Sequence, residues 1–260
     1  IRVEGDKLVL EKGNRAGFAV NEPVRISSHD GFFGQAKCVA LRLLDAPERH
    51  LELTLDKALP VPVGAKSGNP ERCGKSYKII GCTLGNTRSR GILVKGDDGL
   101  IQDCIITGCG MSAVSIGPEY YWNEANYCWN VTVANNHFRH NSLRNNLNAD
   151  GVIFLHGDGT IGNRSINIAD NTFEENYCPY MMNLGWADGV KITGNVISAP
   201  SPLPLSDPGY LIHLHDIRHV VLKGNTYNQP GPSVVRAVEV GKNVEGVTGN
   251  DATGIRLTEI

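Results

Sequence analysis

The sequence predicts an all-β protein, namely a right-handed parallel β-helix preceded by a small antiparallel β-barrel or β-sandwich unit. One short motif recurs at least six times, with alternating apolar residues leading to an Asn or Cys and then to another apolar residue. Its copies are YKIIGCTL (77–84), GLIQDCII (99–106), VTVANNHF (131–138), INIADNTF (166–173), VKITGNVI (190–197) and VVLKGNTY (220–227), with a fainter EGVTGNDA at 245–252. Period-two alternation indicates strands. A repeat of 22 to 35 residues is typical of a solenoid with variable loops.

The motif has one fixed anchor position. Its occupants are Cys82, Cys104, Asn136, Asn171, Asn195 and Asn225, with Asn250 in the faint copy. Asn tolerates the left-handed backbone conformation of a sharp bend, and its amide can bond to the Asn of the next coil. We therefore expect an Asn ladder that the two Cys extend as small buried residues. The alternative is an antiparallel sandwich with Asn in its hairpins, but sandwiches rarely keep one residue at the same place in every unit.

A second apolar strand follows each anchor. These strands are RGILVKG, SAVSIGP, DGVIFLHG, YMMNLGW, YLIHLHD and RAVEVGK. Each coil should therefore hold a strand, a tight bend, a second strand and a longer loop, and stacking of coils buries the apolar faces. Residues 1–70 lack the repeat and read as four β-rich stretches. We assign residues 1–70 to the small antiparallel unit and residues 71–260 to the β-helix.

The charge and hydropathy of the chain limit the classes of partner that it is expected to bind. The chain of 260 residues has 25 Lys and Arg against 27 Asp and Glu, so no basic patch points to nucleic acid. No apolar run is long enough to cross a bilayer, so no membrane partner is expected. The chain starts at Ile1 without Met, as a processed product or fragment does, and sequons at Asn130 and Asn163 favour a secreted glycoprotein. The seven cysteines match no zinc pattern, and we expect neither a metal nor a cofactor.

The loop GPEYYWNEANYCWN (117–130) combines aromatic and acidic residues. Sugar rings present apolar C–H faces that stack on aromatic rings, while carboxylates accept hydrogen bonds from sugar hydroxyls. The loop therefore predicts an oligosaccharide or polysaccharide partner, with Glu119 and Trp122 in contact with it. For Tyr121 and Trp129, packing back over the side of the helix is an equal alternative.

Glycoside hydrolysis needs two carboxyl groups across the scissile bond, and spacing alone selects no pair. The candidate catalytic residues are Asp150, Asp158 and Glu124, and the candidate substrate-binding residues are Glu119, Trp122, Arg88, Arg90 and His156. Asp97 and Asp98 precede a strand and are first a turn signal. His213 and His215 share one strand face, which fits a metal pair, a sugar-binding face or plain surface, but no third ligand stands at metal spacing.

Three segments resemble glycoside hydrolase family 110: GNTRSRGILVKGDDGLIQDC (85–104), SAVSIGPEYYWNEA (112–125) and NVTVANNHF (130–138). The resemblance covers roughly residues 20–230. It implies an exo-acting, inverting α-galactosidase on a β-helix, with Trp122 and Glu124 touching substrate and Arg88 or Arg90 lining the cleft. The family also has a small β-barrel between coils, which would suit residues 1–65. Its Asp-Asp-x-Ile-Asn-x-His type motif upstream of the barrel is missing from this sequence, so the chain is similar to the C-terminal part of such an enzyme, with the main catalytic acids outside it.

Two other functions fit the same residues. A polysaccharide lyase or a polygalacturonase-like hydrolase uses the same fold, and His156-Gly157-Asp158 follows a strand as part of the latter pattern does. A non-catalytic carbohydrate-binding protein or surface antigen is the third possibility, and the missing acid motif favours it.

Overall fold

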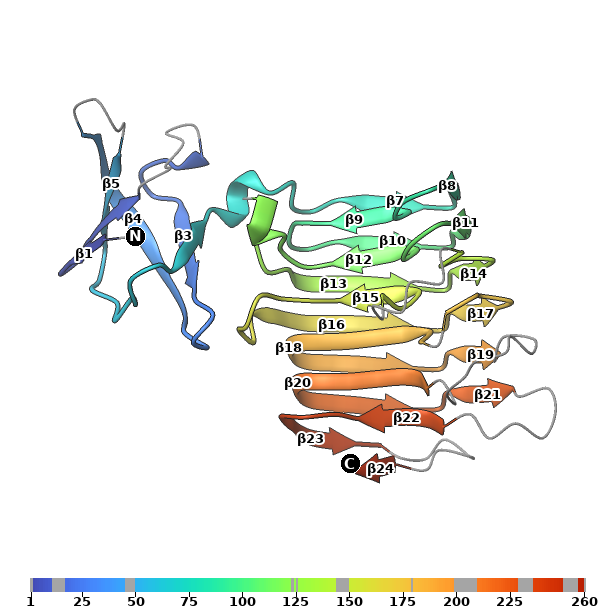
Figure 1. The fold of residues 1–260 in the computed structure, drawn as a ribbon. Coiled ribbons are helices and arrows are strands. Elements are labelled where there is room, and N and C mark those ends of the chain that lie inside the picture. Colours follow the sequence, from blue (N-terminus) through green and yellow to red (C-terminus); the bar gives the residue numbers. More distant parts are fainter. Residues whose placement is uncertain are drawn as a thin grey trace.

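The computed structural model of the chain is built almost entirely of β-strands and has two parts, which lie side by side in Figure 1. It describes residues 2–10, 17–44, 50–122, 124, 126–143, 150–178, 180–198, 210–228, 236–249 and 257–259. The faint seventh repeat is only partly within these ranges, because Asn250 lies outside them. Half of the polar loop 139–150 and nearly all of the Pro-rich loop 198–209 also lie outside the described residues.

The first part is an antiparallel sheet of six strands with a hydrophobic core of its own. In the order in which they lie side by side, its strands are β1 (Arg2–Glu4), β2 (Lys7–Leu10), β5 (Leu51–Leu55), β4 (Phe33–Leu43), β3 (Pro23–Ser27) and β6 (Lys66–Gly68). The long strand β4 pairs with both β3 and β5, and its register shifts between Cys38 and Ala40. Alternation places Leu51, Leu53 and Leu55 inside. The short 3₁₀ helix η2 (Pro70–Arg72) then leads into the first coil.

The second part is a stack of coils with three faces, which we number in the order in which the chain visits them. The first sheet holds β7 (Lys78–Ile80), β10 (Leu100–Gln102), β13 (Trp129–Ala134), β16 (Asn163–Ala169), the later halves of β18 (Met182–Thr193) and β20 (Tyr210–Lys223), and β23 (Val244–Thr248). The second sheet holds β8 (Thr83–Thr87), β11 (Ile105–Cys109), β14 (His137–Arg139), β17 (Thr172–Glu174), β19 (Val196–Ser198) and β21 (Thr226–Asn228). The third sheet holds β9 (Ile92–Val94), β12 (Val114–Ile116), β15 (Ile153–Leu155), the earlier halves of β18 and β20, β22 (Arg236–Val240) and β24 (Leu257–Glu259).

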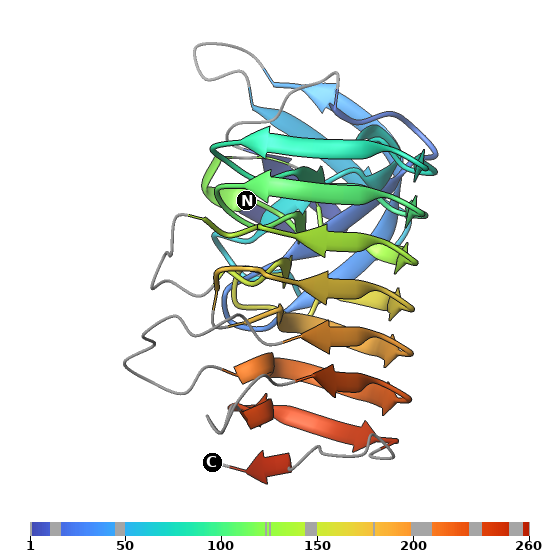
Figure 2. The same ribbon diagram turned by 90° about the vertical axis from the view of Figure 1, so that its right-hand side faces the viewer.

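Neighbouring strands of these three sheets are parallel, as the sequence predicted. The long strands β18 and β20 belong to two sheets at once, because each turns a corner at a residue with positive φ, Trp186 at 55° and Asp216 at 45°. Figure 2 shows the coils as successive layers from the teal β7 to the red C-terminus. The architecture is the all-β parallel β-helix that the repeat predicts.

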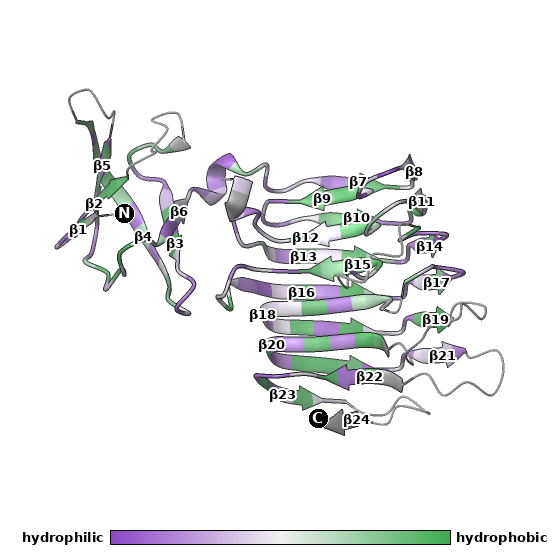
Figure 3. Cartoon of the chain, in the orientation of Figure 1, coloured by the Kyte–Doolittle hydropathy of each residue, from purple (hydrophilic) through white to green (hydrophobic). Residues whose placement is uncertain are grey.

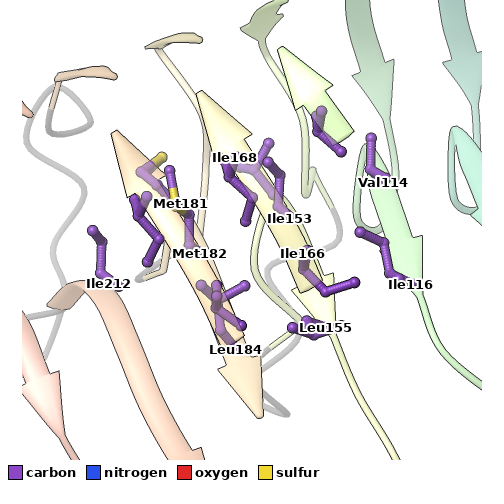
Figure 4. Close-up of a cluster of buried hydrophobic side chains, with 14 of the residues drawn as sticks. Val114, Ile116, Ile153, Leu155, Ile166, Ile168, Met181, Met182, Leu184 and Ile212 are labelled. Carbon is purple, nitrogen blue, oxygen red and sulfur yellow. The ribbon is translucent and has the colours of Figure 1, made fainter. Parts of the chain in front are cut away.

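The inward-facing apolar residues of all three sheets form one continuous core. Figure 4 shows how Ile116, Leu155 and Leu184 follow one another from coil to coil on the third sheet and meet Ile166 and Ile168 from the first. Along the long strands β18 and β20, hydrophobic and hydrophilic residues largely alternate (Figure 3). Because the side-chain period of a strand is two, this alternation leaves every second residue of the third sheet on its outer face.

The predicted Asn ladder is present at the bend between the first and second sheets. The side-chain Oδ1 of Asn171 accepts hydrogen bonds from the backbone N and the Nδ2 of Asn136, at 2.9 and 3.0 Å. The same pattern repeats between Asn171 and Asn195, and between Asn195 and Asn225. Cys104 extends the ladder, since its backbone N donates to Asn136 Oδ1 at 2.9 Å. All four amides are buried.

A second, shorter ladder was not predicted. Asn141 Oδ1 accepts from the backbone N of Cys109, and Asn176 Oδ1 accepts from the backbone N of Asn141. The two Asn stand five residues after Asn136 and Asn171, at the end of the second sheet's strands. All seven cysteines of the chain are free thiols, and five are buried, in keeping with a role as small hydrophobic residues.

The two parts meet where the third sheet passes into the first. Phe33 packs against Tyr127 and Trp129, with ring centroids 6.0 Å apart in both pairs. Ser27 Oγ donates to Tyr120 Oη at 3.1 Å, and Thr160 Oγ1 donates to the carbonyl of Ser28. Three aromatic residues of the loop 117–130, Tyr120, Tyr127 and Trp129, therefore pack in the contact between the two parts.

Candidate functional site

Two rows of side chains run along the outer face of the third sheet, parallel to the helix axis. The strand register places Leu93, Ser115, Phe154, Asn183, His213 and Glu239 in the first row. Two residues further along each strand, the second row holds Lys95, Gly117, His156, Gly185, His215 and Gly241. Neighbouring strands lie about 4.8 Å apart, so each row brings side chains from distant parts of the sequence next to one another.

A charged cluster centred on Glu119 covers the beginning of this face. Glu119 lies in the loop after β12, and only 14% of its side chain is exposed. Its Oε1 is 3.0 Å from Nη1 of Arg90, and its Oε2 is 2.9 Å from Nζ of Lys95. Burial raises the pKa of Glu119, but the hydrogen bond and charge of Lys95, together with the charge of Arg90, outweigh it and leave the pKa lowered. Glu119 is therefore ionised at neutral pH.

Asp150, just before β15, also interacts with the charge of Arg90, but its pKa is shifted in the other direction. Burial raises its pKa. The charge of Arg90 opposes that rise and the negative charge of Glu119 adds to it. Glu119 and Asp150 are thus two carboxyl groups that both interact with the charge of Arg90, and the pKa of Glu119 is lowered while that of Asp150 is raised.

His156 stands beside this pair in the second row. Its Nε2 is 3.2 Å from Oγ of Ser115, and its ring stacks on Phe154 with centroids 4.7 Å apart. Burial, with a smaller contribution from the charge of Lys95, lowers the pKa of His156 to about 4. The imidazole is therefore neutral at neutral pH and can exchange hydrogen bonds without carrying charge.

Further along the face, four rings form a continuous run that we call the ring platform: Tyr180, His213, His215 and Trp186. Their centroids are 5.1 Å apart from Tyr180 to His213, 5.2 Å from His213 to His215, and 6.0 Å from His215 to Trp186. Nδ1 of His213 is 3.0 Å from Oδ1 of Asn183, which fixes the orientation of that ring. Trp186 lies on β18, Tyr180 just before it, and His213 and His215 on β20, so the ring platform is beyond His156 along the helix axis.

The structure brings Glu119, Arg90, Asp150 and His156 together, all of which the sequence had suggested. Trp122 ends the 3₁₀ helix η3 (Tyr120–Trp122), where its backbone N donates to the carbonyl of Glu119 at 2.9 Å, and 67% of its side chain is exposed. The ring of Trp122 is therefore accessible to a ligand, and its contact with a sugar stays a prediction.

Of the other predicted residues, Glu124 adjoins the cluster through its backbone, whereas Arg88 and Asp158 form no hydrogen bond or ion pair with it in the part of the chain that the structure describes. Arg88 is exposed on the turn after β8. Glu124 is exposed and contacts Glu119 through a backbone bridge. Asp158 is at the junction with the antiparallel unit, with Oδ1 3.1 Å from Nδ1 of His29. Their predicted roles in substrate binding and catalysis stay predictions.

Trp129, for which packing was an open alternative, lies against Phe33, and the guanidinium of Arg25 is 3.7 Å from its ring centroid. Among the residues that the structure describes, no group of three or more His, Cys, Asp or Glu is arranged to hold a metal ion. Within the same ranges, no helix has the length and apolar character needed to span a bilayer.

Residues 71–251 match the family described as the right-handed β-helix region, over more than half of the chain. The chain belongs to this family. No curated protein has a matching sequence. The fold of this β-helix protein therefore rests on both the family match and the stack of parallel coils.

Several residues on the outer face of the third sheet were not predicted from the sequence, namely Lys95, Ser115, Phe154 and Asn183. A signal for them was present, because the aligned second strands alternate and the positions between their apolar residues must face outward. The loop contacts carried no such signal, since Glu119 reaches Arg90 and Lys95 only by folding back over the sheet.

Proposed function

We propose that this β-helix protein binds a glycan on the outer face of the third sheet and hydrolyses it at the charged cluster. One observation carries the proposal: the carboxylate of Glu119 is held 3.0 Å from Arg90 and 2.9 Å from Lys95 on this face, and the carboxyl group of Asp150 interacts with the charge of the same Arg90. Two carboxyl groups in one charged site can supply the acid and the base of glycoside hydrolysis. Parallel β-helices with such an outward face suit carbohydrate polymers, because successive coils repeat along the axis as the sugars of a polymer do.

In the proposed reaction, Asp150 is the acid. It donates its proton to the glycosidic oxygen as the bond from that oxygen to the anomeric carbon breaks. Glu119 is the base, which takes a proton from the water that attacks the anomeric carbon on the opposite side. The products are two sugars with free hydroxyl groups, and the proton balance closes when Glu119 releases its proton to solvent and Asp150 takes one up from it. Arg90 and Lys95 keep Glu119 ionised, and neutral His156 is placed to bond a sugar hydroxyl.

The finer form of the proposal is an inverting exo-α-galactosidase. The resemblance of residues 85–138 to that class of enzyme supports it, and so does the exposure of Trp122 one turn after Glu119. An aromatic ring beside the acids can stack on the apolar face of a terminal sugar. In this proposal the acids are those of the charged cluster rather than a motif upstream of the antiparallel unit.

Hydrolysis by the full chain tests the proposal. We would measure p-nitrophenol released from p-nitrophenyl α-galactoside, and reducing ends released from galactomannan and from polygalacturonate. Asp150→Asn and Glu119→Gln should each lower kcat by at least about 100-fold, since each removes a proton-transfer group. Asp170→Asn is the matched control, because Asp170 is an exposed bend residue on the far side of the coil. Full activity in Asp150→Asn would exclude this mechanism.

A non-catalytic carbohydrate-binding protein is the second candidate, and the ring platform favours it, because stacked rings bind sugars without any acid. Binding of galactomannan by the wild-type protein with no hydrolysis of any substrate would support this function. Binding of polygalacturonate with release of an unsaturated product would instead point to a lyase. Absence of both binding and hydrolysis would rule out a carbohydrate function at this face.

A further inference from the structure

The ring platform lies beyond the charged cluster along the helix axis, and nothing in the proposed hydrolysis uses it. We propose that it is a second sugar-binding subsite, so that the ligand is an extended neutral oligosaccharide whose chain runs along the third sheet from the charged cluster to β20. This inference rests on the proposed function and deepens it, since it names the length, the direction and the charge of the substrate.

The geometry of the rings supports a sugar subsite. Tyr180, His213, His215 and Trp186 form an unbroken run across two neighbouring coils, with each ring contacting the next. Both imidazoles are about one-fifth exposed. Rings with exposed area, fixed orientation and polar edges suit sugars, which offer apolar C–H faces and hydroxyls together.

A buried carboxylate, that of Asp216, sets the orientation of the His215 imidazole. Nδ1 of His215 is 3.1 Å from Oδ2 of Asp216, and Nδ2 of Asn243 donates to the other carboxylate oxygen of Asp216 at 2.7 Å. Asp216 is buried, so this chain of contacts holds the ring of His215 without covering it. Because one ring nitrogen is engaged by the carboxylate, the other remains to bond a sugar hydroxyl.

Glycine makes room for these rings. A Cβ atom at Gly185 would stand 2.2 Å from Cε1 of His215, and one at Gly241 would stand 3.2 Å from Nε2 of His213. Any larger residue at Gly185 would displace the imidazole that now lies across this position. The second row therefore alternates between a ring-bearing residue and a glycine, at His156, Gly185, His215 and Gly241, which keeps the rings close to the sheet.

The distance between the two sites sets the minimum ligand. His156 directly follows β15 and His215 is on β20, with β18 between these two strands. Two steps of about 4.8 Å separate these strands by about 10 Å. One pyranose ring cannot contact both positions, so a ligand that reaches the ring platform from the charged cluster contains several sugar units.

Charge favours a neutral glycan. Two carboxylates border the ring platform: that of Asp216 is 3.1 Å from Nδ1 of His215, and that of Glu239 is 3.5 Å from Nε2 of His213. Burial, with a smaller effect of His215, lowers the pKa of His213 to about 4, so this imidazole is uncharged at neutral pH. Arg90 and Lys95, the cations of the charged cluster, are already paired with Glu119. A uronate carboxylate on the platform would face the carboxylates of Asp216 and Glu239 beside an uncharged imidazole.

Binding of a length series by the full-length chain tests this inference. By calorimetry we would titrate galactose, then α-galactosyl-terminated galacto-oligosaccharides from two to five units, then oligogalacturonates of the same lengths. Affinity should rise with length until the chain spans both sites. His215→Ala should weaken binding of the longest neutral oligosaccharide about tenfold, as expected for the loss of one ring contact of about 1.4 kcal/mol, and should leave galactose unchanged.

The controls separate packing from recognition. His215→Phe keeps a ring and should retain most of the affinity for the long oligosaccharide. His219→Ala removes the third histidine of the same strand, which is 73% exposed and lies beyond the corner on the first sheet, and should have no effect. If His215→Ala does not fold, Tyr180→Ala tests the same platform from the neighbouring coil.

The outcomes distinguish this inference from the proposed function. Equal affinity for galactose and the pentasaccharide, or equal weakening of both by His215→Ala, would overturn the extended subsite while leaving the proposed function standing. Tighter binding of oligogalacturonates than of the neutral series would overturn the neutral ligand. Failure of every sugar to bind would overturn both.

Discussion

Arg25 of the antiparallel unit and Asp97 of the first coil form a buried two-point ion pair. Nη1 of Arg25 is 2.9 Å from Oδ1 of Asp97, and Nη2 is 2.6 Å from Oδ2. The same guanidinium donates to the carbonyl of Tyr127 and lies over the ring of Trp129. Asp97 was interpreted from the sequence as a turn residue, yet its carboxylate also accepts from the backbone N of Trp129. The pair thus fastens the two parts of the chain to each other.

This pair gives the first prediction. Arg25→Met should lower the free energy of unfolding by about 3–5 kcal/mol, because it leaves a buried carboxylate without its partner. The double variant Arg25→Met/Asp97→Asn should recover part of that loss, since Asn keeps the acceptor for Trp129. Urea denaturation measures both. Arg42→Met, which removes an exposed partner of Glu52, is the control and should cost less than about 1 kcal/mol. A loss in Arg25→Met as small as in Arg42→Met would contradict the assignment.

The Asn ladder gives the second prediction. Asn171→Ala should lower the free energy of unfolding by about 3 kcal/mol, because the carbonyl of Val133 and the backbone N of Asn136 then lose buried hydrogen bonds. Asn135→Gly, at the exposed neighbouring position with positive φ, should change it by less than about 1 kcal/mol. Thermal and urea unfolding measure the difference. Equal stability of the two variants would show that the ladder is dispensable.

The third prediction concerns pH. Because the pKa of His213 is lowered to about 4 in the folded protein, the unfolded chain binds its proton first as pH falls. Stability is therefore complete above about 6.5, the pKa of an unperturbed His, and is lost as pH falls from there toward 4. His213→Gln should flatten this part of the curve of unfolding free energy against pH. His219→Gln is the matched control on the same strand, and an unchanged slope in His213→Gln would count against the role of burial.

The fourth prediction concerns the proposed reaction. Lys95 lowers the pKa of Glu119 by a hydrogen bond and by its charge. Lys95→Met should therefore raise that pKa and move the acid limb of the profile of kcat against pH to higher pH. Lys78 is an exposed residue of β7, and Lys78→Met should leave the profile of kcat against pH unchanged. A uniform loss of activity without a shift of the acid limb would mean that Lys95 acts on packing alone.

Particular residues show how much of the site can be predicted from the sequence. Glu119, Arg90, Asp150 and His156 were chosen from their residue types and loop positions, but the sequence could not pair them, because they come from three successive coils. Asp158 was chosen on the same grounds and lies instead against His29. Residue type therefore selected candidates, and the docking of the antiparallel unit decided which of them remain on the outer face.

The fold itself followed from the sequence, because a period of two within strands and a repeated Asn between them are local properties of the chain. The repeat required stacked coils, and the Asn amides joined them as their chemistry predicted. The site was decided by tertiary structure. Contacts such as Glu119 with Lys95, or Tyr180 with His213, depend on the register between coils and on loops folding back over the sheet. Loop lengths differ from coil to coil, so only the stacked chain brings these side chains within hydrogen-bonding and ring-contact distance.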